Sequence, residues 1–236
     1  MIKRYPAEER YSADHGWLKS WFTYSFANHY DPDNLNFGPM RVLNDDIIAP
    51  SRGFGAHPHQ EMEIVTVVLS GQLQHEDSTG ERAVTTWGGI QRMTAGTGVV
   101  HSEVNPSPTE EVRSLQMWFL PEEDGLPPSY EKTEFHLDEL KDQLLPVVSK
   151  RYADGKTVAG IHQDLTIYLS ELTEGRQIEF SQEPGRKVFV FVLEGSMNIQ
   201  DVELKRRDSA RITDITSLTL SASEMCRFML IDLPAN

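Results

Sequence analysis

Short hydrophobic runs separated by turn residues are the feature of this sequence that most limits its fold. Apolar and polar residues alternate within the runs, and a new run begins roughly every 8–12 residues. This pattern is typical of an all-β chain, because successive side chains of a strand point to opposite faces of a sheet. The sequence predicts strands at Met62–Leu69, Leu73–Asp77, Ile90–Thr94, Val99–Val104, Val112–Leu120, Thr166–Leu172, Val188–Leu193, Met197–Asp201, Arg211–Asp214 and Arg227–Leu233.

Two segments in the middle of the chain depart from the β pattern. Pro121–Pro128 contains two consecutive prolines and three acidic residues, a composition that favours an extended linker. Beyond it, Leu137, Leu140 and Leu144 follow the spacing of a helix face. We therefore expect one short helix at Leu137–Leu145.

A short internal repeat divides the chain. Val67–Asp77 resembles Phe191–Asp201, 124 residues later, and each copy has a strand, an x-Gly turn and a second strand that ends in Asp. One copy lies on each side of the proline-rich segment, and a chain of 236 residues is long enough for two domains. The sequence predicts two β domains, residues 1–125 and residues 126–236.

Composition excludes several classes of protein. The 36 acidic and 22 basic residues give a net charge of −14, which opposes direct binding of nucleic acid. The longest apolar run, Val188–Leu193, is far shorter than the ~20 residues of a membrane helix, and Met1–Pro6 lacks the apolar core of a secretory signal. The single cysteine, Cys226, excludes an intrachain disulfide framework. We expect a cytoplasmic protein without a membrane partner.

Two pairs of potential metal ligands form the strongest chemical signal. The His-Pro-His segment at 57–59 is followed, 42 residues later, by the His-Ser-Glu segment at 101–103. Residues i and i+2 of a strand point to the same face, about 7 Å apart. If the two segments are neighbouring strands, three imidazoles and one carboxylate converge. Glu61 and Glu63 continue the spacing of two, so in one continuous strand their side chains point to the same face as the first pair. They are candidates for reserve ligands or for partners of the ligands.

Either pair alone has a simpler interpretation, because a His-x-His sequence in a loop is most often a solvent-exposed polar pair. Two such pairs on predicted strands of one small β domain favour a metal site instead. Gly98, at a predicted turn just before the second pair, strengthens this interpretation.

The same residues resemble the two motifs of the cupin superfamily. His57-x-His59-x3-Glu63, with Gly71 beyond it, resembles the first motif, and Gly98-x2-His101-x3-Asn105 resembles the second. Three features depart from the usual pattern. Gly96 replaces the motif proline, Glu63 lies one residue nearer the His pair than usual, and Glu103 is an additional carboxylate.

This combination is similar to the pirin family, whose members are bicupins. The segments that carry the resemblance are Asp14–Asn28, Arg41–Asp46, Gly55–His59 and Ala95–Glu103. The resemblance spans the N-terminal half and is weaker in the C-terminal half. It implies two tandem cupin-type β-barrels with few short helices, and a metal held by His57, His59, His101 and Glu103.

The repeat also predicts what the second domain lacks. A constant offset of 124 residues places the counterparts of the four ligands at Ser181, Glu183, Met225 and Arg227. Serine, methionine and arginine side chains are poor ligands for a divalent cation, and arginine repels it. We therefore expect a C-terminal cupin-like domain without metal ligands, which serves packing or contact with a partner.

Three imidazoles and one carboxylate suit Fe(II), Ni, Mn, Co, Cu or Zn, and the resemblance favours Fe(II). Some pirins resemble quercetinases, which open the ring of a flavonol with O2 and release CO. The resemblance thus implies an oxidoreductase, a monomer, in which Glu103 takes the proton of the flavonol hydroxyl. The alternative is a redox-sensing regulatory partner of another protein, without substrate turnover.

Candidate substrate contacts are less well defined by the sequence. Gln116 is a polar residue in an apolar strand, which indicates either a cavity or a solvent-facing edge, and Phe54 and Met93 contact either the substrate or the core. His75 is interpreted as exposed or locally hydrogen-bonded. An aromatic cluster is expected to clamp the N-terminal segment onto the barrel rather than to bind a nucleotide: Trp17, Trp21, Phe22, Tyr24 and Phe26.

Overall fold

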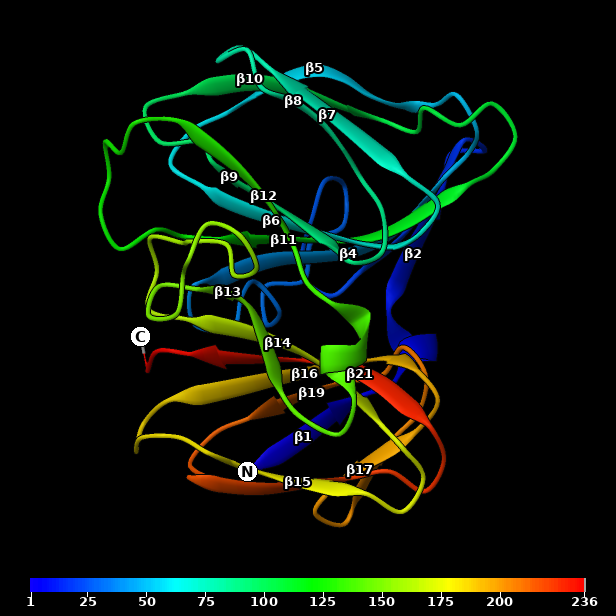
Figure 1. Ribbon diagram of the computed structural model, residues 1–236, viewed down its shortest axis with the longest axis vertical. Helices are drawn as coiled ribbons and strands as arrows, with labels where there is room; N and C mark the ends of the chain where they lie inside the picture. Colours follow the sequence, from blue (N-terminus) through cyan, green and yellow to red (C-terminus); the bar gives the residue numbers. More distant parts are fainter. Residues whose placement is uncertain (236) are drawn as a thin grey trace. The chain divides into compact units, whose positions relative to one another are not determined.

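The computed structural model describes residues 1–235 and consists almost entirely of antiparallel β-structure (Figure 1). This confirms the all-β prediction. The chain forms two compact units. The N-terminal unit comprises Tyr11–Glu134 and Ala153–Gln163, and the C-terminal unit comprises Met1–Arg10, Phe135–Tyr152 and Asp164–Asn236.

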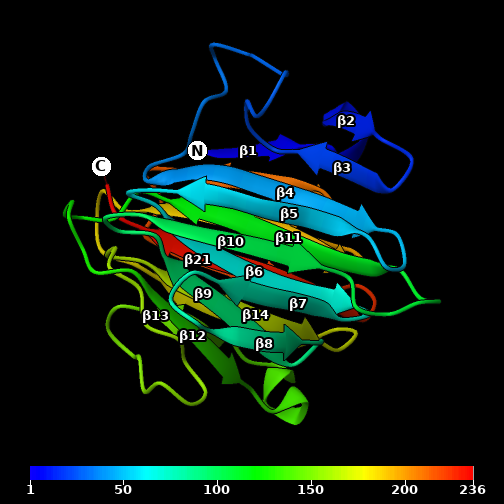
Figure 2. The ribbon, with the colours of Figure 1, turned by 90° about the horizontal axis from the view of Figure 1, so that it is seen from above.

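The N-terminal unit contains two sheets, which Figure 1 shows one above the other. The larger sheet has the strand order β12-β9-β6-β11-β4-β3-β2. The smaller has the order β5-β10-β7-β8, and its strands lie side by side in Figure 2. The strands are β2 Tyr11–Asp14, β3 Leu18–Phe22, β4 Met40–Ile48, β5 Gly53–His59, β6 Glu63–Ser70, β7 Leu73–Asp77, β8 Arg82–Thr85, β9 Gly89–Thr94, β10 Val99–Val104, β11 Val112–Phe119 and β12 Ser129–Glu134.

The C-terminal unit repeats this arrangement with sheets ordered β1-β19-β16-β21-β14-β13 and β15-β20-β17-β18. Its core is a continuous cluster of buried apolar side chains. The elements are β1 Ile2–Tyr5, η1 Ala7–Glu9, η2 Leu137–Leu140, β13 Leu145–Ser149, β14 Thr166–Leu172, β15 Gln177–Ser181, β16 Lys187–Glu194, β17 Met197–Ile199, β18 Val202–Leu204, β19 Ser209–Ile212, β20 Ser217–Ser221 and β21 Cys226–Leu233.

The compact units differ from the expected ranges 1–125 and 126–236. In the C-terminal unit β1 pairs with β19, at the sheet position that β12 occupies beside β9 in the N-terminal unit. Each larger sheet is therefore completed by a strand that lies beyond the expected boundary. Residues 126–134 and 153–163 belong to the N-terminal unit, and the first ten residues belong to the C-terminal unit.

The short helix expected at Leu137–Leu145 begins at Leu137, as predicted, but covers only the first part of that range. Within the described chain, the 3-10 helix η2 ends at Leu140, and Leu145 begins strand β13. Leu137 is half exposed whereas Leu140 is buried, so the leucines do not form one buried helix face. Pro146 and the β-branched residues after it favour an edge strand over a helix.

The internal repeat is present as the hairpins β6-β7 and β16-β17. Gly71 and Gly195 occupy the same turn position with φ of +72° and +73°. A Cβ atom at either position would collide with a backbone oxygen, that of Glu111 or Met225 respectively. Both turns therefore require glycine for two reasons, the left-handed backbone and the close approach of another strand.

The constant offset of 124 residues holds for this hairpin but not for the strands that follow. The counterpart of β10 in the second unit is β20, which pairs with β15 and β17 as β10 pairs with β5 and β7. The counterparts of the His-x-Glu pair are consequently Leu218 and Leu220, not Met225 and Arg227. The loops between the strands differ in length, and a fixed offset cannot follow them.

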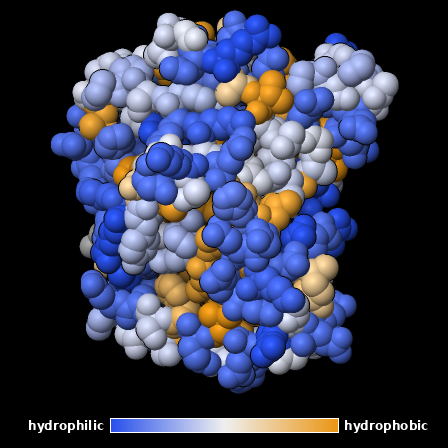
Figure 3. Space-filling model, in the orientation of Figure 1, coloured by the Kyte–Doolittle hydropathy of each residue, from blue (hydrophilic) through white to orange (hydrophobic). Residues whose placement is uncertain are grey.

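The visible face of the molecule in Figure 3 is mainly hydrophilic, with small separate hydrophobic groups. The described residues include no helix of the length and apolar character that crossing a membrane requires.

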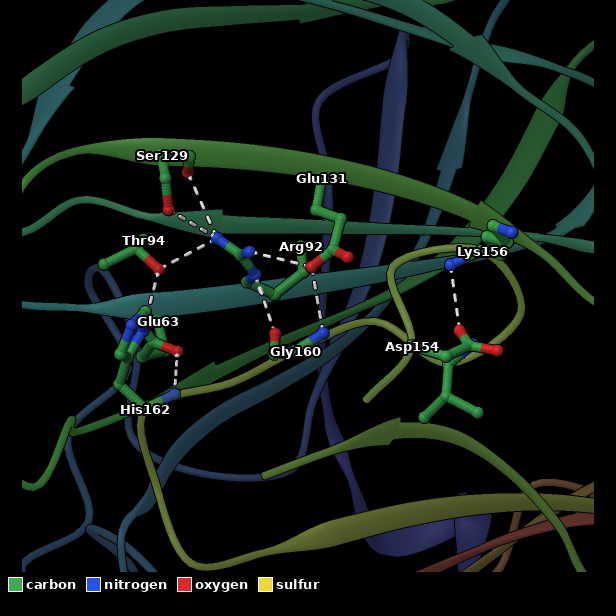
Figure 4. Close-up of polar contacts among 10 residues, drawn as sticks. Glu63, Arg92, Thr94, Ser129, Glu131, Asp154, Lys156, Gly160 and His162 are labelled. Atoms are coloured by element: carbon green, nitrogen blue, oxygen red, sulfur yellow. Dashed lines mark hydrogen bonds and ion pairs between the residues drawn. The ribbon is translucent and has the colours of Figure 1, made fainter. Parts of the chain in front are cut away.

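A buried arginine holds the returning segment Ala153–Gln163 on the larger sheet of the N-terminal unit (Figure 4). Arg92 Nε donates to the Gly160 carbonyl oxygen at 2.8 Å, and Arg92 Nη1 donates to Ser129 Oγ at 2.7 Å. Arg92 Nη2 forms an ion pair with Glu131 Oε2 at 2.8 Å, and the same carboxylate oxygen accepts from Gly160 N–H. One side chain thus joins the segment to β9 and β12.

Replacement of this arginine should weaken the N-terminal unit. We expect Arg92→Met to lower the free energy of unfolding by about 2–3 kcal/mol, because it leaves the Glu131 carboxylate without its cation. Urea unfolding measures the loss, and proteolysis within Ala153–Gln163 should accelerate. Arg82→Met is the matched control, because its guanidinium is exposed and lies 3.8 Å from Glu76. That change should cost less than about 0.5 kcal/mol, and equal losses would contradict the assignment.

Candidate metal centre

Strand β10 carries one half of the predicted ligand set and lies between β5 and β7 (Figure 2). On one side, His101 pairs with His57 of β5. On the other side, Glu103 pairs with His75 of β7. A register shift between residues 101 and 103 on the β5 side marks a β-bulge, which re-aims side chains locally. The pairing brings side chains of three strands together.

Three imidazoles meet on the inner side of this sheet. One ring nitrogen each of His57, His59 and His101 lies within 4.8 Å of the others. The ring centroids of His57 and His101 are 4.4 Å apart. Among the described residues, His101 also belongs to a second group of potential ligands with His75 and Glu103. The structure thus brings the three predicted histidines together. Glu103 lies beside them, in the second group that shares His101.

Hydrogen bonds determine which nitrogen of two of these rings carries a lone pair. His57 Nδ1 lies 2.7 Å from the carbonyl oxygen of Gly55, which can only accept, so Nδ1 carries the proton and Nε2 the lone pair. His75 Nε2 lies 2.9 Å from Asp77 Oδ2, and His75 Nδ1 lies 3.4 Å from His101 Nδ1. The carboxylate makes His75 Nε2 a donor and His75 Nδ1 an acceptor. His101 therefore donates through Nδ1, and its Nε2 keeps the lone pair.

The His101 Nε2 atom is buried and has no hydrogen-bond partner among residues 1–235. Burial lowers the pKa of His59 to about 4 and that of His101 to about 3, and the charge of His57 contributes to both shifts. The His59 and His101 rings are therefore neutral at pH 7, the form in which imidazole binds a metal. Three converging imidazoles with an unused buried nitrogen fit a divalent transition metal.

Glu103 is buried and held by a short chain of hydrogen bonds from β11. Gln116 Nε2 donates to Glu103 Oε2 at 2.6 Å, and Trp118 Nε1 donates to Gln116 Oε1 at 3.0 Å. Burial raises the pKa of Glu103, while the hydrogen bond from Gln116 acts in the opposite direction. The Trp118 indole thus orients the Gln116 amide, which in turn orients the carboxylate.

A pocket of about 310 Å³ opens beside the histidines, and His57, His59 and Glu103 form part of its wall. Aromatic residues form much of the remainder. They are Phe22, Phe26, Phe54 and Trp118. A largely apolar cleft with a few convergent polar groups is typical of a small-molecule site.

Comparisons with known proteins agree with this geometry. The chain matches the family model Pirin over residues 5–119 and the model Quercetinase C-terminal cupin domain over residues 147–233. It is 41% identical, over 99% of both chains, to quercetin 2,3-dioxygenase of Escherichia coli strain K12. The chain belongs to the pirin family. The two matched models support the bicupin prediction.

One further relative and one solved structure extend the comparison. A pirin-like protein of Caulobacter vibrioides is 35% identical over 98% of this chain and 99% of its own. The crystal structure of the bacterial pirin YhhW from Escherichia coli in complex with nickel(II) matches all of both chains, with a TM-score of 0.94 and 39% identity.

Of the three predicted substrate contacts, two line the pocket and one does not. Phe54 and Gln116 line the pocket. Met93 instead lies in a buried cluster with Ile64 and Ala95. Met93 belongs to β9, where it pairs with Ile64 of β6, and its side chain is part of the core. The expectation of a substrate contact at Met93 therefore does not match its position.

Glu63 was expected to support the ligands, but its carboxylate engages the returning segment. Glu63 Oε2 accepts from the backbone N–H of His162 at 2.8 Å (Figure 4). Glu63 does not share a face with His57 and His59, because β5 ends at His59 and β6 begins at Glu63. Glu61 lies in a left-handed turn between the two strands, at φ 48°. Alternation does not continue through a turn.

Three residues of the site were not predicted to take part in it. His75 is 1% exposed and hydrogen-bonds locally to Asp77 Oδ2, which is one of the two roles expected for it, and the His75-x-Asp77 spacing on one strand is the signal for this contact. Asn44 and Asp46 of β4 line the pocket. Burial raises the pKa of Asp46 to about 7, and nearby carboxylates add to the shift. Two adjacent acids in a strand point to opposite faces, but no strand at Met40–Ile48 is among those expected from the sequence.

The hydrogen-bond chain from Asp77 leads to a prediction about metal affinity. In Asp77→Asn the amide oxygen can still accept from Thr79, as Asp77 Oδ1 does at 2.8 Å, while the NH2 group faces His75. Both rings must then reverse their tautomers, which places a proton on His101 Nε2. We expect a 10–100-fold loss of affinity for a divalent metal, measured by competition with a chelating dye, where ~10–100 is the usual effect of such partners.

The exposed neighbour Glu76 supplies the control for this change. Glu76→Gln alters charge on the same strand by the same amount and should leave the metal affinity within about twofold. Nitrogen chemical shifts of the metal-free protein report the tautomers directly. An unchanged affinity in Asp77→Asn together with a reversed His101 tautomer would contradict the prediction.

Proposed function

We propose that this chain is a metal-dependent dioxygenase that opens flavonols such as quercetin with O2 and releases CO. The observation that carries the proposal is the group of three converging imidazoles and a buried carboxylate at an aromatic-lined pocket. Relatives that cover the whole chain are named quercetin 2,3-dioxygenase, which supports the same reaction. Both oxygen atoms of O2 enter the product, and one ring carbon leaves as CO.

The proposed ligands of a single divalent metal are His57, His59, His101 and Glu103. A bound divalent cation supplies positive charge that lowers the pKa of a flavonol hydroxyl beside it. We favour Fe(II), as the family resemblance implies, while the same donors also accept Ni, Mn, Co, Cu or Zn. The structure of the Escherichia coli pirin in complex with nickel(II) supports a divalent metal as the cofactor.

Glu103 is the proposed base that removes the proton of the flavonol hydroxyl. Burial raises its pKa, so the carboxylate accepts a proton more readily than an exposed one. Gln116 keeps Glu103 Oε2 in a fixed direction through the 2.6 Å hydrogen bond. Trp118 and Phe54 offer apolar surface to the flavonol rings and exclude water from the deprotonated hydroxyl.

The proposal treats the chain as a monomeric, cytoplasmic enzyme with a flavonol and O2 as its small-molecule partners. The alternative of a redox-sensing regulatory partner predicts a different result. A regulatory protein would bind another protein differently in the Fe(II) and Fe(III) states and would leave quercetin unchanged. Turnover of quercetin therefore distinguishes the two functions.

Loss of the visible absorbance of quercetin in air measures the proposed reaction, and CO is trapped by reduced haemoglobin. We expect His57→Ala/His101→Ala to lower the rate by more than about a hundredfold, since two ligands are lost at once. His136→Ala, in the C-terminal unit, is the control and should retain the rate. Equal rates for wild type and the double variant would show that the absorbance loss is not enzymatic.

Removal and replacement of the metal test its identity. Dialysis against a chelator should reduce quercetin turnover to the rate of the double variant, and Fe(II) should restore it. We expect Fe(II) to give a higher kcat than equimolar Ni(II), Mn(II), Co(II), Cu(II) or Zn(II). A higher kcat with another ion would overturn the choice of iron while leaving the dioxygenase proposal intact.

A further inference from the structure

The polar floor of the pocket extends beyond the proposed ligands. Gln116 of β11, which donates to Glu103, lies opposite Asn44 of β4. On the same strand, Asp46 lies opposite Ser20 of β3. Asn44, Asp46, Ser20 and Gln116 all line the pocket. Neighbouring strands lie about 4.8 Å apart, so the polar floor crosses three strands away from Glu103.

An aromatic wall follows the same direction as the floor. The Trp118 ring lies 4.9 Å from that of His59 and 5.4 Å from that of Phe26. Phe26 in turn lies 5.2 Å from Phe22 of β3. The wall therefore begins at a proposed ligand and ends at the strand that carries Ser20. The pocket pairs a continuous apolar surface with a row of hydrogen-bonding groups.

Asn44, one of the residues that line the pocket, carries an acceptor that no other group of the described chain uses. Its side chain is 5% exposed, and its Oδ1 atom has no hydrogen-bond partner among residues 1–235. A buried acceptor without a donor is unfavourable. An O–H group of a ligand in the pocket would supply the missing donor.

Asp46 adds a second polar group two residues along the same face of β4. Ser20 Oγ donates to Asp46 Oδ1, which leaves Oδ2 available to a ligand. The neighbouring Asp45 points to the opposite face, where it forms an ion pair with Arg113 at 2.6 Å. Strand alternation therefore sends one carboxyl group to the pocket and the other away from it.

We propose that Asn44 and Asp46 form a subsite for a substrate hydroxyl group other than the one that Glu103 deprotonates. The inference rests on the proposed function and narrows its substrate class. The aromatic wall accepts a flat ring system, and the polar row accepts hydroxyl groups along one side of it. The preferred substrates are therefore aromatic compounds with hydroxyl groups remote from the metal, rather than any flavonol.

Two test compounds distinguish binding at this subsite from binding at the metal centre. Quercetin carries several hydroxyl groups, whereas 3-hydroxyflavone keeps only the hydroxyl of the central ring. Quenching of tryptophan fluorescence, with Trp118 in the pocket wall, measures the affinity of the metal-loaded protein for each ligand without O2. We expect wild type to prefer quercetin by at least about tenfold, the usual effect of one or two hydrogen bonds.

Asn44→Leu should reduce the ratio of the two affinities to near unity. Asp46→Asn should also reduce this ratio. The ratio of the two affinities is the readout, because general damage to the pocket lowers both affinities together. Asn198→Leu, the same replacement in β17 of the other unit, is the matched control and should keep the wild-type ratio. In air, the two variants should consume quercetin with a higher KM, while kcat stays near that of wild type.

The outcomes distinguish the subsite from the reaction. Equal affinities in wild type, or a wild-type preference retained by both variants, would overturn the subsite. A preference for quercetin that the variants lose, without consumption of quercetin in air, would support the subsite and contradict the dioxygenase proposal. Consumption of both ligands without any preference would support the dioxygenase and overturn the subsite.

Discussion

The pairing of β10 with β5 on one side and β7 on the other is the constraint on which the candidate centre depends. One neighbour brings the His-x-His pair to His101, and the other brings His75 behind the same ring. His101 therefore faces the ligand cluster with Nε2 and the Asp77 relay with Nδ1. A shift of β10 by one residue would turn His101 and Glu103 to the opposite face of the sheet. Register, more than any single side chain, determines whether the site exists.

The larger sheet of the N-terminal unit places two neighbouring acidic residues on opposite faces. Asp45 pairs with Arg113 on one face, while Asp46 lines the pocket on the other. Burial raises the pKa of Asp46 to about 7, and the charge of Glu103 contributes. Such a buried polar floor opposes stability, because its groups are desolvated and Asn44 Oδ1 lacks a donor. The proposed binding role would account for polar groups that an ordinary core excludes.

Local periodicity explains how much of this structure the sequence predicts. The bounds of β7 and β10 match the expected ranges, because each strand alternates and ends at a turn residue. The same period of two identifies the His-x-His and His-x-Glu pairs. The placement of β1 and β12 depends on pairing between distant segments, which local patterns do not contain. The roles of His75 and Asn44 likewise arise only when β7 meets β10 and β4 meets β11.

The C-terminal unit shows that this topology alone does not make a metal site. Phe180 pairs with Leu218 in the sheet position where His57 pairs with His101, and Ile199 pairs with Leu220 where His75 pairs with Glu103. These counterparts are the buried apolar residues Phe180, Ile199, Leu218 and Leu220. Their side chains offer no lone pair to a cation, and they fill the space between the sheets. The same strand order therefore holds a packed core in one unit and a polar pocket in the other.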